Sequence, residues 1–300
     1  MTDQTLVVRP AQPTDFPAVL RLIQQHYGAD YGEPVISGSD LQDLWGRADL
    51  GQSTCLIERS QLLLAYAYVQ ARPQADGTTI RAALHTSPAA RDQRLEALLL
   101  EQIERTAAGA APRTIQATVT NSPARPALEE RGYRLRIAFQ TMTITLPPGY
   151  TAVVVPEQVA ISPFMVGQDD EAAYQADEAA SQDKGYAQPT PFDSWAARML
   201  ADPAMCFVAR AGATIVGGVY VQRVVDEQVG IVQHLGVRRE WRGRGIGRAL
   251  LERAFTALAE AGISSVTLDV DAQSQTGADK LYAACGMRAT GTRHIYEKQL

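Results

Sequence analysis

The sequence predicts an α/β (α+β) fold made of two tandem copies of one domain. Its length of 300 residues suits two domains of ~150 residues each. Within each half, β-rich runs alternate with stretches of helical periodicity. Segments of the first half also recur, in the same order, in the second half. We therefore expect a first domain over residues 1–147 and a second domain over residues 151–300.

The internal repeat rests on three pairs of segments with offsets of 152, 151 and 154 residues. The pairs are AYAYVQ ending at Gln70 with GGVYVQ ending at Gln222, RDQRLEALLLEQ from Arg91 with RGRGIGRALLER from Arg242, and LEERGYR around Gly132 with YAACGMR around Gly286. Three matches in one order indicate a duplicated domain. The proline-rich stretch TLPPGYTAVVVPEQ, residues 145–158, lies where a linker is expected.

The elements of the second copy follow in order from residue 204. Residues 204–225 predict a β-hairpin, and residues 228–237 predict a further strand. A glycine-rich loop then leads into a helix that Gly262 ends, with its apolar stripe formed by Leu250, Leu251, Ala254, Phe255 and Leu258. Residues 263–270 alternate as a half-buried strand, and a short helix from Ala278 to Cys285 precedes a last strand near residues 293–300. The first copy opens similarly, with a strand and then a helix starting near Asp15.

Composition narrows the class of protein. A hydrophobic content of 46% with 20% charged residues is that of a folded chain. The net charge of −5 argues against a general nucleic-acid binder. Three scattered cysteines fit neither a disulfide framework nor a zinc site, so we expect reduced thiols and no metal. Because no signal core and no apolar run of ~18 residues occurs, we expect a cytoplasmic protein, monomeric or homodimeric, without a membrane partner.

The segment REWRGRGIGRALLERAF, from Arg239 to Phe255, joins a predicted strand to the long amphipathic helix. A glycine-rich turn at a helix start directs several unpaired backbone N–H groups, and the positive end of the helix dipole, toward one point. Glycines let an oxygen approach the main chain without meeting a Cβ atom. The ligand that fits is a phosphate or pyrophosphate. We expect binding by Arg242, Gly243, Arg244, Gly245, Ile246, Gly247 and Arg248.

Three kinds of phosphate-binding loop have glycines between a strand and a helix. A P-loop needs Gly-Lys-Ser/Thr, which is missing from this segment. The dinucleotide pattern G-x-G-x-x-G places Arg248 at its third glycine, although Asp269 lies at a suitable distance downstream, so a dinucleotide site stays an alternative. The acetyl-CoA loop, Arg/Gln-x-x-Gly-x-Gly/Ala, is matched fully from Arg242 to Gly247.

From about Phe207 to its end, the chain resembles the GNAT superfamily of acetyl-CoA-dependent N-acetyltransferases. The segments LGVRREWRGRGIGRALL and VDAQSQTGADKLYAACGM carry the resemblance, the second being similar to V-x-x-x-N-x-x-A-x-x-L-Y-x-x-x-G-F. The whole chain resembles the tandem, mycothiol synthase-like members. The chain departs from the pattern at two positions, with Ser274 nearest to the family's cofactor-contacting asparagine and Met287 in place of phenylalanine.

The resemblance implies a twisted, mixed, mostly antiparallel sheet flanked by helices in each copy. It also implies that the fourth and fifth strands splay apart, so that the backbone of Gly236 and Val237 faces the acetyl carbonyl of acetyl-CoA, with Leu235 also among the expected cofactor-binding residues. The expected reaction is direct transfer of acetyl to a primary amine of a small molecule. Tyr282 matches the family's tyrosine near the thioester sulfur and is the expected general acid. The alternative for Tyr282 is a core tyrosine on a short helix.

The general base is less clearly marked. Many family members carry a glutamate on the strand before the loop, whereas VGIVQHL offers His234, which strand alternation places on the face opposite Gln233 and Leu235. A structural histidine, or an ordered water relayed to solvent or to a carboxylate, are the alternatives. The acidic run of residues 167–186 suits a cationic amine, but for most of its carboxylates we favour a solvated helix face.

In the first copy, the loop motif is replaced by Arg91-Asp92-Gln93-Arg94-Leu95-Glu96. Long side chains occupy the places of the key glycines, two of the new side chains are acidic, and Leu128 stands at the position of the tyrosine. We therefore expect an inactive copy that braces the second domain or shapes the acceptor cleft. The alternative to a catalytic protein is a non-catalytic acyl-CoA sensor or interaction module.

Overall fold

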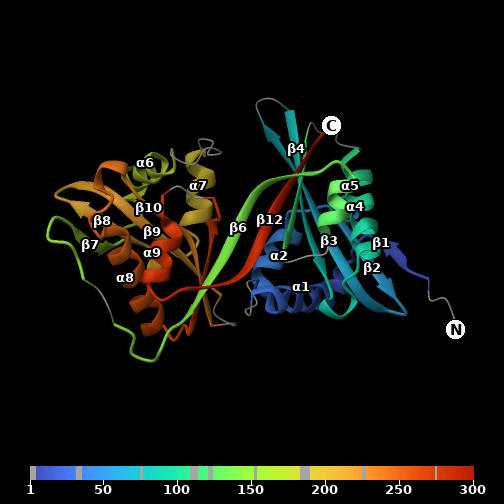
Figure 1. The fold of residues 1–300 in the computed structure, drawn as a ribbon, viewed down its shortest axis with the longest axis horizontal. Helices are drawn as coiled ribbons and strands as arrows, with labels where there is room; N and C mark the ends of the chain where they lie inside the picture. Colours follow the sequence, from blue (N-terminus) through green and yellow to red (C-terminus); the bar gives the residue numbers. More distant parts are fainter. Residues whose placement is uncertain are drawn as a thin grey trace. The chain divides into compact units, whose positions relative to one another are not determined.

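The computed structural model describes residues 5–31, 36–74, 77–108, 114–120, 124–151, 154–182, 190–224, 228–273 and 276–300. The contacts between residues divide the chain into two compact units (Figure 1). The first unit contains Met1–Gln140 and Thr290–Leu300, and the second contains Thr141–Ala289. Each unit is a mixed α/β structure, as the sequence predicts.

The first unit has the strand order β1-β2-β3-β4-β5-β12-β6. The β4–β5 pair is parallel, and the β1–β2, β2–β3, β3–β4 and β5–β12 pairs are antiparallel. The elements are β1 (Val7–Arg9), α1 (Phe16–Tyr31), α2 (Gly38–Gly46), α3 (Leu50–Ser53), β2 (Thr54–Arg59), β3 (Leu62–Gln74), β4 (Gly77–Thr86), α4 (Gln93–Ala108), β5 (Thr114–Thr120), α5 (Ala124–Glu130) and parts of β6 (Arg134–Thr145) and β12 (Arg288–Gln299).

The second unit repeats this plan with the strand order β6-β11-β10-β9-β8-β7. Here the β10–β11 pair is parallel, and the β7–β8, β8–β9 and β9–β10 pairs are antiparallel. The elements are β7 (Ala160–Pro163), α6 (Asp170–Ser181), α7 (Phe192–Met199), β8 (Phe207–Ala211), β9 (Thr214–Val224), β10 (Val229–Val237), α8 (Ile246–Glu260), β11 (Ser265–Asp271) and α9 (Ala278–Ala284). The expected mixed, mostly antiparallel sheet is therefore confirmed for both copies.

The last strand of each copy lies partly in the other compact unit. Leu146 N–H donates to Ser264 O beside β11 (2.8 Å), so the end of β6 belongs to the second unit. Residues 293–299 of β12 pair with β5 of the first unit. The predicted division at residues 147–151 follows the repeat along the chain, whereas the compact units exchange these two strand segments. Which copy binds and catalyses stays a prediction.

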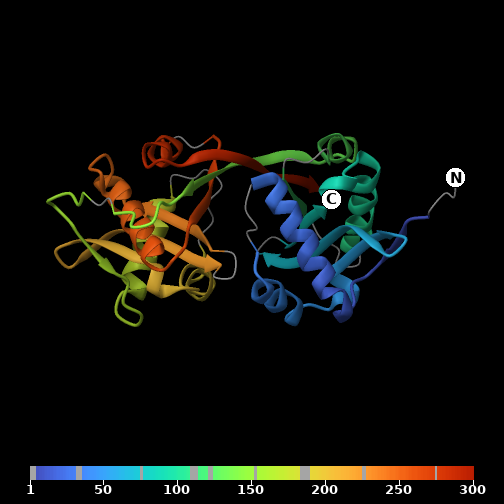
Figure 2. The same ribbon diagram turned by 90° about the horizontal axis from the view of Figure 1, so that it is seen from below.

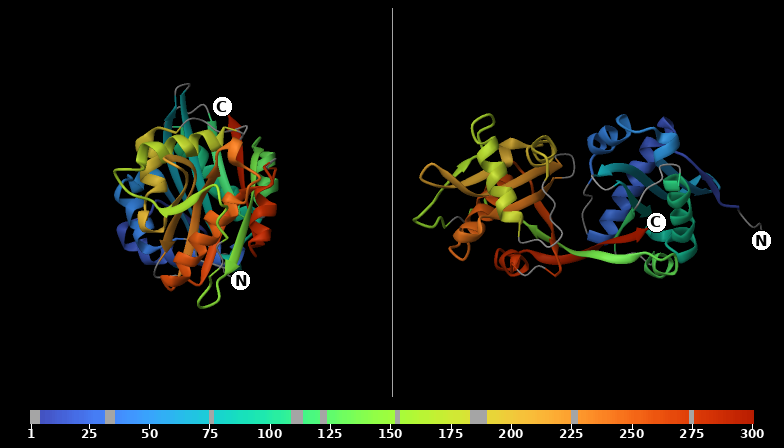
Figure 3. Two further views of the ribbon diagram at one scale, coloured as in Figure 1. Left: turned by 90° about the vertical axis from the view of Figure 1, so that its left-hand side faces the viewer. Right: turned by 90° about the horizontal axis from the view of Figure 1, so that it is seen from above.

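Helices cover both faces of the sheet in the second unit. α8 packs on one face through its predicted apolar stripe, and Gly262 follows the helix with φ +79°, the left-handed conformation that a glycine end requires. α6 and α7 cover the other face, where Trp195 and Tyr220 are buried. Figures 2 and 3 show these two helices on the side of the sheet away from α8. The residues between β10 and α8 therefore emerge at the boundary of two separate cores.

Candidate functional site

The loop between β10 and α8 uses its three glycines in two different ways. Gly243 and Gly245 have φ of +73° and +78°, a conformation that residues with a Cβ rarely adopt. Gly247 is helical, and a Cβ there would lie 3.3 Å from Leu281 Cδ2 and 3.8 Å from Val237 Cγ2. The first two glycines thus shape the loop, and the third lets α8 pack closely against α9 and β10.

The N-terminus of α8 carries no side-chain cap, because Gly245 is the N-cap residue. The backbone N–H groups of Ile246, Gly247 and Arg248 form the first turn. N–H groups in a first turn have no partner within their own helix, and the helix dipole adds partial positive charge there. A glycine cap leaves room for an external acceptor, so this helix end suits an anionic group.

The three arginines of the loop have different partners. Arg242 donates to Val237 O (2.9 Å) and to Ala180 O (3.0 Å), which ties the end of β10 to α6. Arg244 donates to Glu240 O (3.0 Å) and stacks over Trp241 at 4.8 Å. Arg248 pairs with Glu252, a carboxylate that is only 3% exposed, at 2.7 Å. The guanidinium groups therefore also hold the loop in shape.

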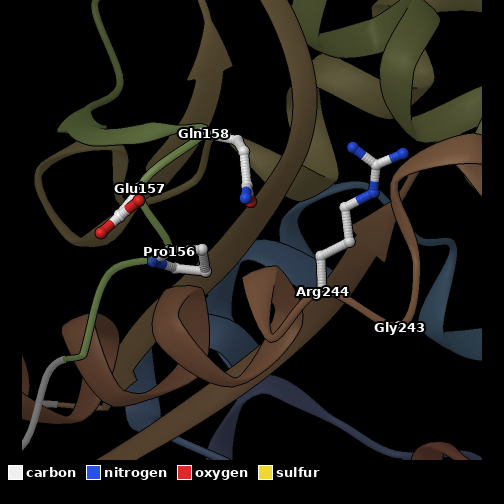
Figure 4. A pocket seen from close by; sticks show the side chains of 5 residues that line it. All are labelled: Pro156, Glu157, Gln158, Gly243 and Arg244. Atoms are coloured by element: carbon white, nitrogen blue, oxygen red, sulfur yellow. The ribbon is translucent and has the colours of Figure 1, made fainter.

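A surface pocket of about 640 Å³ opens beside this loop. Gly243 and Arg244 line one side, and Pro156, Glu157 and Gln158 line the other (Figure 4). The figure shows the Glu157 carboxylate directed away from Arg244. Sequence reasoning treated residues 145–158 only as a linker. No sequence motif in these residues indicates that they lie at the glycine loop.

Strands β10 and β11 separate before either ends. Their parallel register runs from Val229–Ser265 to Ile231–Thr267, and β10 continues for six further residues. On its other edge, β10 stays paired with β9 up to Gly236–Gly218 and Val237–Gly217, after a bulge at Gln233. The splay that the family resemblance implies is therefore present, and the backbone of residues 235–237 lies beyond it.

His234 contacts a buried carboxylate that comes from α6. Its Nε2 atom lies 2.9 Å from Asp177 Oδ1, and the other oxygen of Asp177 accepts a hydrogen bond from Trp195 Nε1 at 2.8 Å. A Cβ placed on Gly236 would lie 3.0 Å from Asp177 Oδ1 and 3.2 Å from His234 Nε2. The pair therefore lies directly against the strand backbone at Gly236.

Sequence reasoning missed the roles of Asp177 and Trp195. Asp177 is one of six carboxylates in the acidic run, and nothing in the pattern distinguishes the two that become buried, Asp169 and Asp177, from the others. The bulge at Gln233 also interrupts the simple alternation assumed for this strand. Only the packing of α6 and α7 on β10 brings the three side chains together.

Tyr282 belongs to the core on the α8 side of the sheet. It is 8% exposed, and Leu235 and Val237 pack against the same cluster. Burial, reinforced by the neighbouring Cys285, raises the pKa of the Tyr282 hydroxyl to about 12. The hydroxyl is therefore protonated at neutral pH, the state that a general acid needs. Tyr282 and His234 belong to opposite packing layers of the sheet, because His234 contacts α6 whereas Tyr282 lies in the α8 core.

The remaining predicted site residues are Leu235, Val237, Ile246 and Ser274. The first two contribute side chains to the α8 core, and Ile246 is buried at the start of α8. Ser274 lies outside the described residues. In the part of the chain that the structure describes, no helix is long and apolar enough to cross a membrane.

Comparisons with known proteins match this arrangement. The model of the acetyltransferase (GNAT) family matches residues 171–287. A mycothiol acetyltransferase of Streptomyces scabiei (strain 87.22) is 30% identical over 149 residues, 49% of this chain and 48% of that protein, so the match spans about half of that relative. A mycothiol acetyltransferase of Streptomyces bingchenggensis is 28% identical over 281 residues, 89% of this chain and 88% of that protein.

Two solved structures extend the comparison to the whole chain. A tandem GNAT protein from the clavulanic acid biosynthesis pathway has a TM-score of 0.71 at 14% identity, with 98% of each chain covered, and shows the fold alone. A GCN5-related N-acetyltransferase from Sphaerobacter thermophilus has a TM-score of 0.79 at 30% identity and covers 98% of this chain and 95% of its own. Because that likeness joins sequence and fold over nearly all of both chains, this chain belongs to the GCN5-related N-acetyltransferase (GNAT) family.

Proposed function

We propose that the second unit binds acetyl-CoA and transfers its acetyl group directly to a primary amine of a small molecule. The observation that carries the proposal is the glycine-capped N-terminus of α8 beside the opening between β10 and β11. The first feature suits a pyrophosphate, and the second leaves strand backbone to pair with an extended arm. The loop pocket formed with Pro156 and Gln158 adds room for the nucleotide end.

The glycines of the second unit suit acetyl-CoA, because they keep side chains away from the backbone that would hold it. Side chains at Gly243 and Gly245 would strain the loop, and a Cβ at Gly236 would crowd the His234–Asp177 pair. In this proposal the N–H groups at the start of α8 hold the pyrophosphate. Bound acetyl-CoA supplies the thioester that is the acetyl donor. The backbone of Gly236 and Val237 polarises its carbonyl by hydrogen bonding.

Two side chains handle protons in this proposal. His234 accepts a proton from the attacking amine, because amine nitrogen is nucleophilic only when neutral. Tyr282 donates its hydroxyl proton to the departing thiolate, and its burial keeps that proton in place at neutral pH. In this proposal the two residues act from the two packing layers of the sheet, His234 from the side of α6 and Tyr282 from the side of α8.

The first unit is, in this proposal, the inactive copy. Asp92 Oδ1 accepts the Leu95 N–H at 2.6 Å, so the start of α4 already has a carboxylate where α8 has only glycine. At the positions of Gly218 and Gly236 stand Tyr66 and His85, a register pair whose rings stack at 6.1 Å. The first feature occupies the helix end that α8 leaves without a side-chain cap, and the second places aromatic rings where the second unit has glycines.

Titration calorimetry with acetyl-CoA tests the binding, and thiol release with a panel of amines tests the chemistry. We expect one acetyl-CoA per chain and turnover with at least one amine, the panel starting with the acceptor of the mycothiol acetyltransferases that the chain resembles. Two equivalent sites would contradict the inactive first copy. Tight binding without turnover on any amine would favour the sensor or interaction module.

A further inference from the structure

We propose that Asp177 is a positioning residue for His234 and that Trp195 fixes Asp177 in that role, an inference that rests on the proposed function of His234 as the base. The three side chains come from three elements of the second unit, α6, α7 and β10. Asp177 Oδ1 lies 2.9 Å from His234 Nε2, and Trp195 Nε1 donates to Asp177 Oδ2 at 2.8 Å.

Burial makes this arrangement rigid. Asp177 is 6% exposed and Trp195 is 2% exposed. The indole of Trp195 meets the rings of Tyr174 and Tyr220 edge to face, each at 5.5 Å, so its N–H cannot easily turn away. A buried carboxylate is unfavourable unless its oxygens are matched with donors. The indole of Trp195 donates to Oδ2 of Asp177, and the imidazole of His234 lies against Oδ1 at 2.9 Å as an ion-pair contact.

The contact decides which nitrogen of His234 can accept a proton. An ionised carboxylate is only an acceptor, so the ring nitrogen facing it carries the hydrogen. Neutral His234 is thereby held as the Nε2–H tautomer, and Nδ1 is the basic nitrogen. In the reaction the amine nitrogen loses one proton to Nδ1, and the imidazolium that results is stabilised by Asp177. No further reactant is needed for this step.

Among the residues that the structure describes, Tyr220 of β9, the cross-strand partner of His234, is a further titratable group that packs near the pair. Its hydroxyl contacts Ala173 O at 3.4 Å, and burial followed by the charge of Asp177 raises the pKa of Tyr220 well above its usual range. Tyr220 therefore stays neutral throughout the pH range of an activity assay. Among these contacts, Asp177 is the one that places charge beside the imidazole.

The decisive variant is Asp177→Asn, which keeps the shape of the side chain and an oxygen for Trp195. We expect kcat/KM to fall by ~10²-fold at neutral pH, with acetyl-CoA affinity within twofold of the parent protein. The acid limb of the kcat/KM profile should move to lower pH, because the charge that favours the imidazolium is gone. Trp195→Phe should move the same limb in the same direction by a smaller amount.

The matched control is Asp169→Asn on the same region of chain. Asp169 is 4% exposed and pairs with Arg210 at 2.6 Å, so it is a second buried carboxylate next to α6 without contact to His234. This variant should lower thermal stability while leaving the shape of the pH profile unchanged. If Asp169→Asn and Asp177→Asn shift the profile equally, the effect is structural and the positioning role is wrong.

A readout independent of turnover separates this inference from the proposed function. Long-range ¹H–¹⁵N spectra report the tautomer of each of the four histidines of the chain, with His234 assigned through His234→Gln. We expect the Nε2–H tautomer in the parent protein and loss of that preference in Asp177→Asn. A preserved tautomer in Asp177→Asn overturns the inference. The expected tautomer change together with an inactive parent protein would overturn only the proposed function.

Discussion

The starts of α4 and α8 are the most informative pair of regions in the molecule. Relative to the shared arginine, α4 begins two residues after Arg91, whereas α8 begins four residues after Arg242. The extra helical residues of the first copy are capped by Asp92. In the second copy the corresponding residues form a left-handed glycine loop. One helix therefore has a side-chain acceptor for its first turn, and the other has none.

The parallel strand pairs of the two units also differ, in how far along the strands they stay paired. β4 and β5 pair up to Ala83–Thr118, while β10 and β11 part after Ile231–Thr267. The bulge at Gln233 interrupts the β9–β10 register, and the β3–β4 register is continuous over the corresponding residues. One inserted residue in the strand thus accompanies the opening of the sheet.

In the first unit, the shared arginine, Arg91, belongs to a buried polar cluster. Arg91 pairs with Asp30 at 2.5 Å and contacts His26 Nδ1 at 2.9 Å, and Thr120 bridges His26 and Asp30. In the second unit, the corresponding arginine donates to backbone carbonyls. A few side-chain differences along the same elements thus accompany a different local structure at the start of the helix and at the parallel strand pair.

The largest expected effect is on cofactor binding. Gly245→Glu adds a side chain at φ +78° and a negative charge at the start of α8, so acetyl-CoA affinity should fall at least ~10²-fold, or about 2.7 kcal/mol. Calorimetry measures it. The control is Gly262→Glu, because Gly262 has φ +79° at the other end of α8 and shares the strain but not the site. Equal losses of acetyl-CoA affinity in the two variants would contradict the proposal that this loop binds acetyl-CoA.

The next effect concerns the chemical step. Tyr282→Phe should lower kcat and kcat/KM alike by ~10²-fold, because the hydroxyl acts only in the transition state. Since its pKa is about 12, activity should not decline below pH ~10 through this group. Tyr133→Phe, a buried tyrosine of the first unit, is the control and should leave the rates unchanged. A lower melting temperature with full kcat would identify Tyr282 as a core residue only.

Acid should weaken the first unit through His26. Burial, followed by the charge of Arg91, lowers the pKa of His26 to about 4. The unfolded chain binds a proton at the ordinary pKa of ~6.5, so the unfolded state holds more protons between pH ~6.5 and ~4. The free energy of unfolding should therefore fall by up to about 3 kcal/mol as pH drops through that window.

Hydrogen exchange of β4 and β5 amides between pH 7 and pH 4, corrected for intrinsic rates, measures the acid effect. His26→Gln should flatten this pH dependence. His294→Gln should change it less, because His294 is only partly buried and its pKa is lowered less strongly. An unchanged slope in His26→Gln would show that other groups govern the acid response of this unit, among them His85, whose pKa burial lowers well below its usual range.

The smallest expected effect is at the cap of α4. Asp92→Ala should destabilise the first unit by about 1 kcal/mol, because the Leu95 N–H loses its acceptor. Asp92→Asn, which keeps a side-chain oxygen, should destabilise it less. Urea denaturation measures the difference. Neither variant should create a second acetyl-CoA site, because Glu96 and His85 still occupy the first copy, and a second site in calorimetry would contradict that.

The sequence by itself determined the duplication and the nature of the loop. The repeat offset located both copies, and the glycines at 243 and 245 predicted a turn that only glycine adopts readily. The apolar stripe of α8 and its end at Gly262 were also predicted correctly. These features are local, because backbone conformation and helical periodicity depend on neighbouring residues.

Only the tertiary structure decided the partners of those residues. The contact of His234 with Asp177, the place of residues 156–158 at the loop, and the exchange of β6 and β12 segments each join positions far apart in the chain. The bulge at Gln233 likewise depends on pairing with β9. Such contacts follow from how helices and strands pack, and a carboxylate that becomes buried has the same one-letter code as its solvated neighbours.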